Sequence, residues 1–268
     1  EYYDRYMREQ VLEEQILTGE LTKALENEEI KMYIQPQVDK DGTIIGGECL
    51  ARWVHPEKGI IPPGSFIPIF EKNGRIADID RFIWREACKT LKSWQERGRG
   101  DLFLSVNISP KDLYVLDIFG IFTSLTKEYG IPAANLRLEI TETAVMSDVV
   151  YAQGLIRQLQ REGFIVEMDD FGSGYSSLNT LKDFSMDVLK IDMNFLKQTT
   201  SVQRSRDILE SIIVMAEKLR TDVITEGVET EEQYEFLKNI GCKMFQGYLF
   251  DKPLTRSMFE AKVDFGQK

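Results

Sequence analysis

The sequence is short of the residues that build the commonest zinc and nucleophile sites. It contains a single histidine, His55, which excludes a site of several histidines, a histidine acid–base pair and a His-Glu-x-x-His zinc motif. Its three cysteines, Cys49, Cys88 and Cys242, lie far apart and form no Cys-x-x-Cys pair, a pattern typical of a reducing compartment. We therefore expect a cytoplasmic protein in which any metal ion is held by oxygen ligands.

Positive charge is also scarce. The 268 residues carry 33 Lys and Arg against 44 Asp and Glu, which gives a formal net charge of −11. Binding to a nucleic-acid polymer relies on basic side chains that neutralise phosphates, so we do not expect such a partner. A small phosphate-bearing ligand is compatible with this charge if metal ions supply the missing positive charge.

Long apolar segments are missing too. No run approaches the roughly 20 apolar residues that span a bilayer, and no signal-peptide pattern is present, so we expect no membrane contact from this fragment. The start at Glu1 rather than Met suggests a piece of a longer protein. Apolar residues at helical spacing predict an amphipathic helix over residues 1–28. We assign 1–28 as a linker-like helix and 29–268 as the main domain, although an ordinary first helix fits the pattern equally well.

The rest of the chain alternates between strand-like and helix-like segments. Two apolar runs flank Lys40-Asp41-Gly42, a turn sequence that predicts an antiparallel hairpin. Six further strands, separated by helical segments, are expected at 102–109, 135–141, 164–170, 187–192, 222–227 and 242–247. Helical crossovers between short apolar strands predict a parallel sheet, and eight strands can close a barrel. We therefore predict a TIM-like (β/α)₈ barrel with an antiparallel first strand.

Polar side chains recur where these strands end. In chain order they are Gln35, Glu48 with Arg52, Asn107, Glu139 with Glu142, Asp169 with Asp170, Lys190 with Asp192, Glu226 with Glu229, and Gln246. Any single one is explained as well by solvated surface, but the strand ends of a barrel converge on one face, where active sites lie. The excess of carboxylates favours bound Mg²⁺, Mn²⁺ or Ca²⁺. Adjacent acids suit two ions about 3.5–4 Å apart, an arrangement that with a lysine favours phosphate-ester cleavage.

The segment after the adjacent acids, residues 171–178, is rich in Gly and Ser. It lacks the Gly-Lys-Ser/Thr ending of a nucleotide-binding P-loop, so we do not assign it that role. Its two glycines allow unusual backbone angles, which favours a movable loop beside the site. A plain turn between a strand and a helix is the alternative.

The chain closely resembles the EAL domain, the cyclic di-GMP phosphodiesterase family. The resemblance runs from about residue 21 to residue 253 and rests, in this order, on YIQPQVD, ECLARW followed by HPE, SVNIS, LEITET, DDFGSGYSSL, LKID, TEGVET and QGYLFDKP. It implies hydrolysis of cyclic di-GMP to linear pGpG in bacterial second-messenger signalling. It also implies an upstream sensory or GGDEF-type domain and, in many members, a homodimer.

The resemblance further implies roles for individual residues. One metal ion would be held by Glu48, Asn107, Glu139 and Asp169, and a second by Asp169, Asp170 and Glu226. Lys190 matches the lysine that positions and activates the attacking water, and Glu142 the residue that steadies the loop after Asp170. Contacts with substrate or water are implied at Gln35, Leu50, Arg52, Asn107, Asp192, Glu229, Gln246 and Pro253. The expected ions are two Mg²⁺ or Mn²⁺, with Ca²⁺ inhibitory.

Three positions depart from the usual family sequence. Cys49 replaces the Ala of Glu-Ala-Leu, Ser173 replaces a Thr in the loop, and Thr225 replaces an Ala. Strand alternation places Cys49 on the face opposite Glu48, which favours core packing. Because no metal ligand is lost, we prefer an enzyme over a catalytically silent cyclic di-GMP receptor. The LKID and QGYLFDKP strings disfavour another metal-dependent barrel enzyme, such as an enolase-like lyase.

Overall fold

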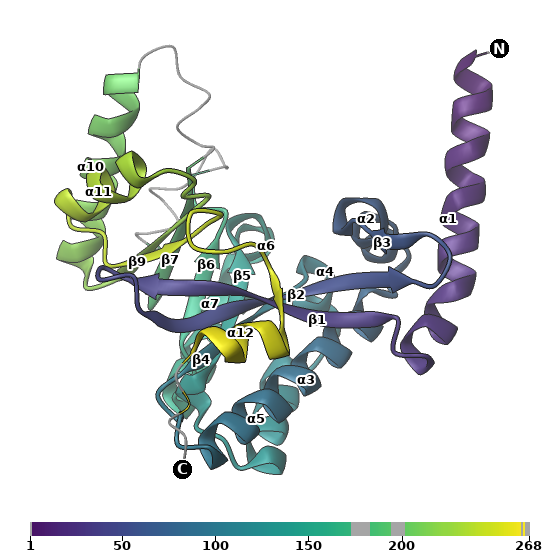
Figure 1. Ribbon diagram of the computed structural model, residues 1–268, viewed down its shortest axis with the longest axis horizontal. Helices are drawn as coiled ribbons and strands as arrows, with labels where there is room; N and C mark the ends of the chain where they lie inside the picture. Colours follow the sequence, from purple (N-terminus) through teal and green to yellow (C-terminus); the bar gives the residue numbers. More distant parts are fainter. Residues whose placement is uncertain (1, 173–182, 194–201, 264, 266–268) are drawn as a thin grey trace.

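The computed structural model describes residues 2–172, 183–193, 202–263 and 265. Eight strands form a closed barrel with helices on its outside (Figure 1). Around the barrel they are β1 (Ile30–Asp39), β9 (Met244–Gln246), β8 (Asp222–Glu226), β7 (Val188–Asp192), β6 (Val166–Asp169), β5 (Leu136–Thr141), β4 (Phe103–Ile108) and β2 (Ile44–His55), which pairs with β1 again. The predicted TIM-like (β/α)₈ barrel is confirmed.

The first strand runs against both of its neighbours. β1 pairs antiparallel with β2 and with β9, whereas all other neighbouring pairs in the closed barrel are parallel. This confirms the antiparallel first strand. The expectation that Gln35 ends its strand is wrong, because β1 continues to Asp39 and Gln35 lies opposite Glu48. Since β1 runs in the reverse direction, its middle reaches the level of the other polar residues.

Helices cover the outside of the barrel. They are α3 (Ile76–Glu96), α4 (Pro110–Val115), α5 (Ile118–Tyr129), α6 (Glu142–Ser147), α7 (Val149–Glu162), α10 (Val202–Leu219), α11 (Glu231–Asn239) and α12 (Arg256–Lys262), with a 3₁₀ turn, η1, at Ala133–Asn135. In α3, Ile76, Ile79 and Ile83 recur at helical spacing and are buried. Asp148 caps the first turn of α7, and Gly163, with a φ of 99°, ends that helix.

The hairpin extends beyond the barrel, where an aromatic cluster continues the main apolar core. β2 continues past Cys49, its last residue paired with β4, and then pairs with β3 (Gly59–Ile61) before α2 (Pro63–Asn73) follows. The ring of Trp53 packs against Phe66 and Phe70 of α2 at centroid distances of 5.8 and 6.1 Å. This cluster lies beside the barrel and receives the N-terminal helix.

Helix α1 (Tyr2–Glu26) packs on this cluster through its second half. Leu17, Leu21 and Ala24 are buried, whereas Leu12 and Ile16 are exposed. The first half of α1 projects away from the rest of the molecule (Figure 1). None of the described helices is both long and apolar enough to cross a membrane.

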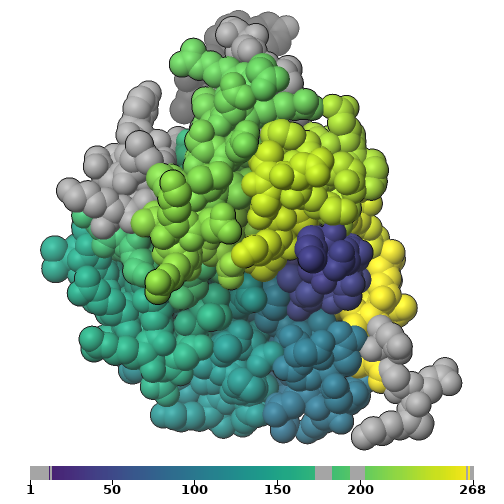
Figure 2. Space-filling view, turned by 90° about the vertical axis from the view of Figure 1, so that its left-hand side faces the viewer, coloured from purple at the N-terminus to yellow at the C-terminus, as the bar shows by residue number. Residues whose placement is uncertain are grey.

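Segments from the C-terminal part of the chain pack against β1 and the hairpin turn. The short strand β10 (Leu254–Thr255) pairs with β1 beyond the barrel, and Tyr234 of α11 donates a hydrogen bond of 2.9 Å to the carbonyl of Lys40 in the hairpin turn. Figure 2 shows this turn, dark purple, beside the yellow C-terminal segments. Inside the barrel, Val188, Ile224 and Met244 form an apolar cluster near the amino ends of their strands, so the polar residues gather toward the other end.

Candidate active site

Lys190 lies at the centre of the polar end of the barrel. Its side chain is 1% exposed, and its ammonium group lies among carboxylates from four other strands. The distances from Nζ to the carboxylate oxygens are 2.7 Å for Glu139, 2.8 Å for Glu226, 3.3 Å for Glu48 and 3.6 Å for Asp169. Side chains alternate between the two faces of a strand, so these residues face the interior together.

Glu48 accepts hydrogen bonds from two amide side chains, one of which contacts two further amides. Asn107 Nδ2 donates to Glu48 Oε1 at 3.0 Å, and Gln246 Nε2 donates to Glu48 Oε2 at 2.7 Å. Gln246 Nε2 also lies 3.3 Å from Gln35 Oε1, and Gln37 Nε2 donates to Gln246 Oε1 at 2.8 Å. Amides from β1, β4 and β9 therefore hold the orientation of this carboxylate. Sequence reasoning placed Gln35, Asn107 and Gln246 here but missed Gln37.

Burial and mutual repulsion shift the acidity of this cluster. Burial, together with the charge of Glu48, raises the pKa of Glu139 well above its ordinary value, and burial raises the pKa of Glu226 to about 8. For Glu48 burial acts in the same direction, but the Lys190 charge and the hydrogen bonds from Gln246 and Asn107 lower its pKa overall. Burial opposes the charge of Lys190, yet the surrounding carboxylates raise the pKa of Lys190 well above its ordinary value.

The oxygen-rich chemistry of the cluster fits a hard divalent cation. Glu139 Oε1 is buried and accepts no hydrogen bond, and Glu226 Oε1 contacts Lys190 as an ion pair without hydrogen-bond geometry. Carboxylate and amide oxygens are the ligands that Mg²⁺ and Mn²⁺ prefer. Within the described part of the chain, no three His, Cys, Asp or Glu side chains form a ready metal site, and the Lys190 ammonium lies between the carboxylates.

The adjacent acids lie at a sharp turn after β6. Asp170 has a φ of 55°, in the left-handed region, and its backbone N–H donates to Asp169 Oδ1 at 2.8 Å. Burial and the charge of Asp169 raise the pKa of Asp170. Glu142, 2% exposed, accepts a hydrogen bond of 3.1 Å from the backbone of Gly172, which starts the Gly/Ser-rich segment. Residues 173–178 of the predicted movable loop, including Ser173, lie outside the described residues.

A cavity of about 350 Å³ adjoins the cluster and extends under α2 and α3. Leu50, Arg52 and Asn107 line it together with Glu71 and Asp80. Burial lowers the pKa of Arg52, whose Nη1 donates to the backbone carbonyl of its neighbour Ala51 at 2.8 Å. The cavity therefore combines a cation suited to phosphate with acids suited to hydrogen-bond donors on a ligand.

The three remaining predicted residues lie around this end of the barrel. Asp192 follows Lys190 by two residues and is paired in register with Glu226, which places both on the inner face. Glu229 is exposed just before α11, and its backbone N–H donates to Gln233 Oε1 at 2.7 Å. Pro253 is half-buried in front of β10. Only Asp192 of these three is brought to the inner face by strand alternation.

Several polar residues of the interior escaped the sequence interpretation. Ser105, Arg137 and Glu167 are hydrogen-bonded to one another inside the barrel, and each precedes a predicted site residue by two positions. Strand alternation would have identified them as inward-facing. Asp80 interrupts the apolar face of α3 four residues after Ile76, and an acid at such a position is itself a signal of a cavity or a polar partner.

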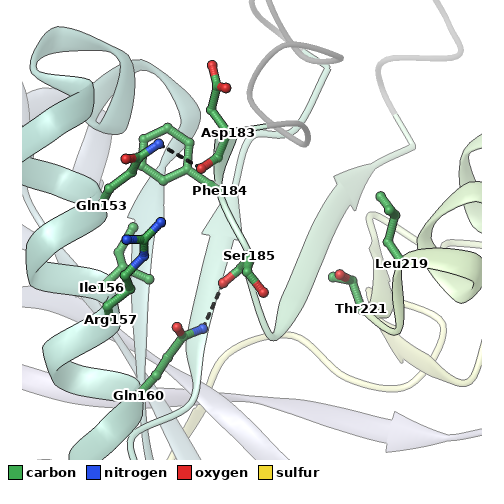
Figure 3. Close-up of a pocket in the computed structure, with 9 residues that line it drawn as sticks. All are labelled: Gln153, Ile156, Arg157, Gln160, Asp183, Phe184, Ser185, Leu219 and Thr221. Atoms are coloured by element: carbon green, nitrogen blue, oxygen red, sulfur yellow. Dashed lines mark hydrogen bonds between the residues drawn. The ribbon is translucent and has the colours of Figure 1, made fainter.

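Another hollow, of about 280 Å³, lies on the outside of the barrel (Figure 3). Helix α7 supplies Gln153, Arg157 and Gln160 to its wall. Gln153 and Gln160 each donate a 2.8 Å hydrogen bond to a backbone carbonyl, of Asp183 and Ser185 respectively. These amides tie α7 to the segment before β7, so they serve the packing of the barrel.

Comparison with known proteins identifies the family. The family model described as EAL domain matches residues 18–253. The chain belongs to the EAL domain family. This EAL domain is 34% identical over 261 residues to cyclic di-GMP phosphodiesterase NbdA of Pseudomonas aeruginosa, which covers 97% of the chain and 33% of NbdA. It is 33% identical over 263 residues to the bifunctional diguanylate cyclase/cyclic di-GMP phosphodiesterase MucR of the same organism, covering 98% of the chain and 38% of MucR.

Solved structures of the family share its fold. The PaMucR phosphodiesterase in complex with c-di-GMP superposes with a TM-score of 0.85 at 34% identity, covering 91% of this chain and 99% of that one. The EAL enzyme Bd1971 in its cAMP- and cyclic-di-GMP-bound form gives a TM-score of 0.88 at 30% identity, covering 95% and 70% of the two chains. The EAL domain spans about a third of the length of NbdA and MucR.

Proposed function

We propose that this EAL domain hydrolyses cyclic di-GMP to linear pGpG with two divalent metal ions, Mg²⁺ or Mn²⁺. The observation that carries the proposal is the Lys190 ammonium group within 3.6 Å of four carboxylates at one end of the barrel. A phosphate diester is an anion, so it approaches such an acidic site only when cations offset the carboxylates. The names of NbdA and MucR and the ligand of the PaMucR complex support the choice of substrate.

The chain offers oxygen ligands for two ions. Glu48, Asn107, Glu139 and Asp169 would hold one, and Asp169, Asp170 and Glu226 the other. When bound, such ions lower the pKa of a water molecule and offset charge on the phosphoryl oxygens. The buried, unbonded Glu139 Oε1 supports this assignment, because an anionic oxygen without a partner is costly inside a protein.

Lys190 acts as a fixed positive donor in this proposal. The carboxylates around it keep it protonated, so it orients the attacking water by donating a hydrogen bond and does not remove the proton itself. Arg52 binds a phosphate of the substrate, and Gln35 and Gln246 hold Glu48 in place while contacting substrate or water. Glu142 positions the segment after Asp170 through Gly172. Leu50, Asp192, Glu229 and Pro253 complete the substrate contacts.

The full protein would extend beyond this domain. MucR, which carries both a cyclase and a phosphodiesterase name, supports an upstream GGDEF-type or sensory domain, and we propose a cytoplasmic homodimer as the working unit. Neither partner is needed for the basic test of function.

The deciding experiment incubates the domain with cyclic di-GMP and either Mg²⁺ or Mn²⁺ and separates the products by chromatography. We expect stoichiometric pGpG, and we expect Lys190→Met to lower turnover at least 100-fold while retaining substrate binding. Tight binding of cyclic di-GMP without any pGpG would contradict the enzyme and favour a silent receptor. Absence of both binding and turnover would exclude both functions.

A further inference from the structure

One buried carboxylate ties together three of the strands that supply metal ligands. Glu167 of β6 is fully buried inside the barrel and pairs in register with Glu139 of β5. We propose that Glu167 is a positioning residue, which fixes the relative heights of the ligands Asn107, Glu139 and Asp169. This inference rests on the proposed function, because it concerns the metal ligands named there.

The contacts of Glu167 reach both preceding strands of the barrel wall. Its Oε2 accepts a hydrogen bond of 3.0 Å from Ser105 Oγ on β4, and its Oε1 accepts one of 3.0 Å from Arg137 Nη1 on β5. We call these three residues the Glu167 clamp. Each carboxylate oxygen therefore serves a different strand, and the clamp spans β4, β5 and β6.

Each member of the clamp shares a strand with one of the ligands. Ser105, Arg137 and Glu167 precede Asn107, Glu139 and Asp169 by two residues each, and alternate residues of a strand share a face. In the sheet register Ser105 pairs with Arg137, and Asn107 pairs with Glu139. Glu167 also pairs with Glu139, so it lies level with that ligand and reaches back to Arg137 and Ser105. A slip or tilt of one strand would break a clamp contact and move a ligand by the same amount.

Charge explains why the clamp contains an arginine. A buried carboxylate requires a partner that offsets its charge. The Arg137 guanidinium, 17% exposed, offsets that charge and lies 3.3 Å from the centroid of the Phe103 ring. Gly46 makes room for this ring, because a Cβ atom there would lie 2.7 Å from two of its carbons. The clamp is thus held by the packing of Arg137 on Phe103 as well as by its two hydrogen bonds.

Mn²⁺ affinity tests the clamp directly. The free aqua ion is measured by electron paramagnetic resonance while each variant is titrated with Mn²⁺ alone. Glu167→Gln keeps an acceptor for Ser105 but turns an NH₂ group toward Arg137, so we expect Mn²⁺ affinity to fall roughly 10- to 100-fold, the range for groups that orient metal ligands. Ser105→Ala removes only the tie to β4, and we expect a smaller loss. Wild-type affinity in both variants would overturn the proposal.

Glu260→Gln is the matched control. Glu260 is also a bridging carboxylate, which accepts from Trp94 at 2.9 Å, Arg97 at 2.6 Å and Arg256 at 2.7 Å, but it lies on α12 outside the barrel. We expect its Mn²⁺ affinity to stay within about twofold of the wild type. An equal loss in Glu260→Gln would assign the Glu167 effect to general destabilisation and overturn the positioning role.

Kinetics separate this inference from the proposed function. In Glu167→Gln we expect a lower kcat that recovers at high Mn²⁺, with an unchanged KM for cyclic di-GMP, because the partners of Glu167, Ser105 and Arg137, are not among the proposed substrate contacts. A wild-type domain that binds Mn²⁺ without hydrolysing cyclic di-GMP would contradict the enzyme, whereas the Mn²⁺ affinities of the variants would still decide the clamp. If Glu167→Gln fails to fold by circular dichroism, Ser105→Ala decides alone, and its wild-type Mn²⁺ affinity would overturn the clamp.

Discussion

At the scale of single residues, the face of the strand determines what a side chain does. Glu48 and Cys49 are neighbours in β2, yet Glu48 turns toward Lys190 whereas Cys49 is 3% exposed in the core. Burial raises the pKa of the Cys49 thiol well above its ordinary value, so the thiol stays neutral. The departure from Glu-Ala-Leu therefore alters packing and leaves the ligand set intact.

A pair of substitutions in β2 tests whether the two faces of the strand have these different roles. Glu48→Ala removes a proposed metal ligand and leaves Lys190 with one carboxylate fewer, and we expect turnover of cyclic di-GMP to fall at least 100-fold. Cys49→Ala restores the common family sequence on the opposite face, and we expect turnover within about twofold of the wild type. Retained activity in Glu48→Ala would show that the ligand assignment is wrong.

Asp80 is the residue whose surroundings most favour a neutral carboxyl group outside the metal cluster. Burial and the charge of Asp112 raise its pKa well above the ordinary value, with Glu71 adding to the shift and the Ser109 backbone N–H opposing it. Burial raises the pKa of Asp112 as well, although the charge of Arg81 opposes the shift. The folded state therefore binds more protons than the unfolded chain, and stability falls as the pH rises above the ordinary carboxyl pKa of about 4.

Replacing the Asp80 carboxyl group with an amide should remove this loss of stability at high pH. We expect Asp80→Asn to unfold at a higher temperature than the wild type at pH 8, by about 2–4 °C for each kcal/mol gained, and the difference to shrink toward pH 5. Thermal unfolding monitored by circular dichroism measures it. Asp78→Asn, an exposed neighbour on the same helix, should show no such pH dependence. A pH-independent difference for Asp80→Asn would contradict the explanation.

At the scale of elements, the two halves of helix α1 lie in different environments. Its second half is hydrogen-bonded to the junction between α2 and α3, where Arg75 Nη2 donates to Thr22 Oγ1 at 2.9 Å and Asn73 Nδ2 donates to Thr18 Oγ1 at 3.1 Å. The family model also begins inside this helix, at residue 18. We therefore propose that the linker function assigned to residues 1–28 is confined to the first half of the helix.

Two leucines on α1 test that proposal. Leu21 is fully buried, so Leu21→Ala should lower the free energy of unfolding by about 2–5 kcal/mol in urea titrations. Leu12 is 58% exposed, so Leu12→Ala should change it by no more than about 0.5 kcal/mol. Equal effects of the two substitutions would mean that α1 does not pack as described.

The elements themselves were largely predictable from the sequence. Apolar runs with helical crossovers placed the barrel strands within two residues of their observed ends, since a strand buried on both faces must be apolar and short. The extension of β2 to His55 and the short strands β3 and β10 were not predicted. They form where the hairpin leaves the barrel, and their partners lie far away in the sequence, so local pattern carries no signal for them.

The site was less predictable than the fold, for a physical reason. Polar residues at strand ends identified the Lys190 cluster, because only function explains so many charges on converging strands. Glu167 and Asp80 were missed because each lies inside an otherwise apolar element, and only the neighbouring elements supply their partners. The partners come from other strands and helices, so their contacts depend on the three-dimensional arrangement.

At the scale of the whole molecule, the excess of acidic residues over basic ones is concentrated at the proposed site. The sequence assigns eight of its 44 acids to the site, and the remaining 36 nearly balance the 33 basic residues. Empty of cations, these carboxylates repel one another, so metal binding should stabilise the folded chain by linkage. The charge of the domain is therefore a property of one end of the barrel more than of its whole surface.

Metal exchange tests this view. We expect EDTA to abolish turnover and lower Tm, and Mg²⁺ or Mn²⁺ to restore both. Ca²⁺ should raise Tm as well but support little hydrolysis, since it prefers looser, higher coordination. Scanning fluorimetry and product analysis on the same samples provide the two readouts. Hydrolysis with Ca²⁺ equal to that with Mg²⁺ would contradict the proposed requirement for a compact coordination sphere.

The antiparallel first strand has a consequence for the nascent chain on the ribosome. β1 can close the barrel only by pairing with β9, and the Gln37–Gln246 hydrogen bond joins residues 209 positions apart. During synthesis, the edge of β1 that faces β9 therefore stays unpaired until β9 has been made. An unpaired strand edge is prone to aggregation and to chaperone binding. Because Gln246 also holds Glu48, a prematurely terminated chain that lacks β9 has no complete site, and such truncated products should be catalytically inert.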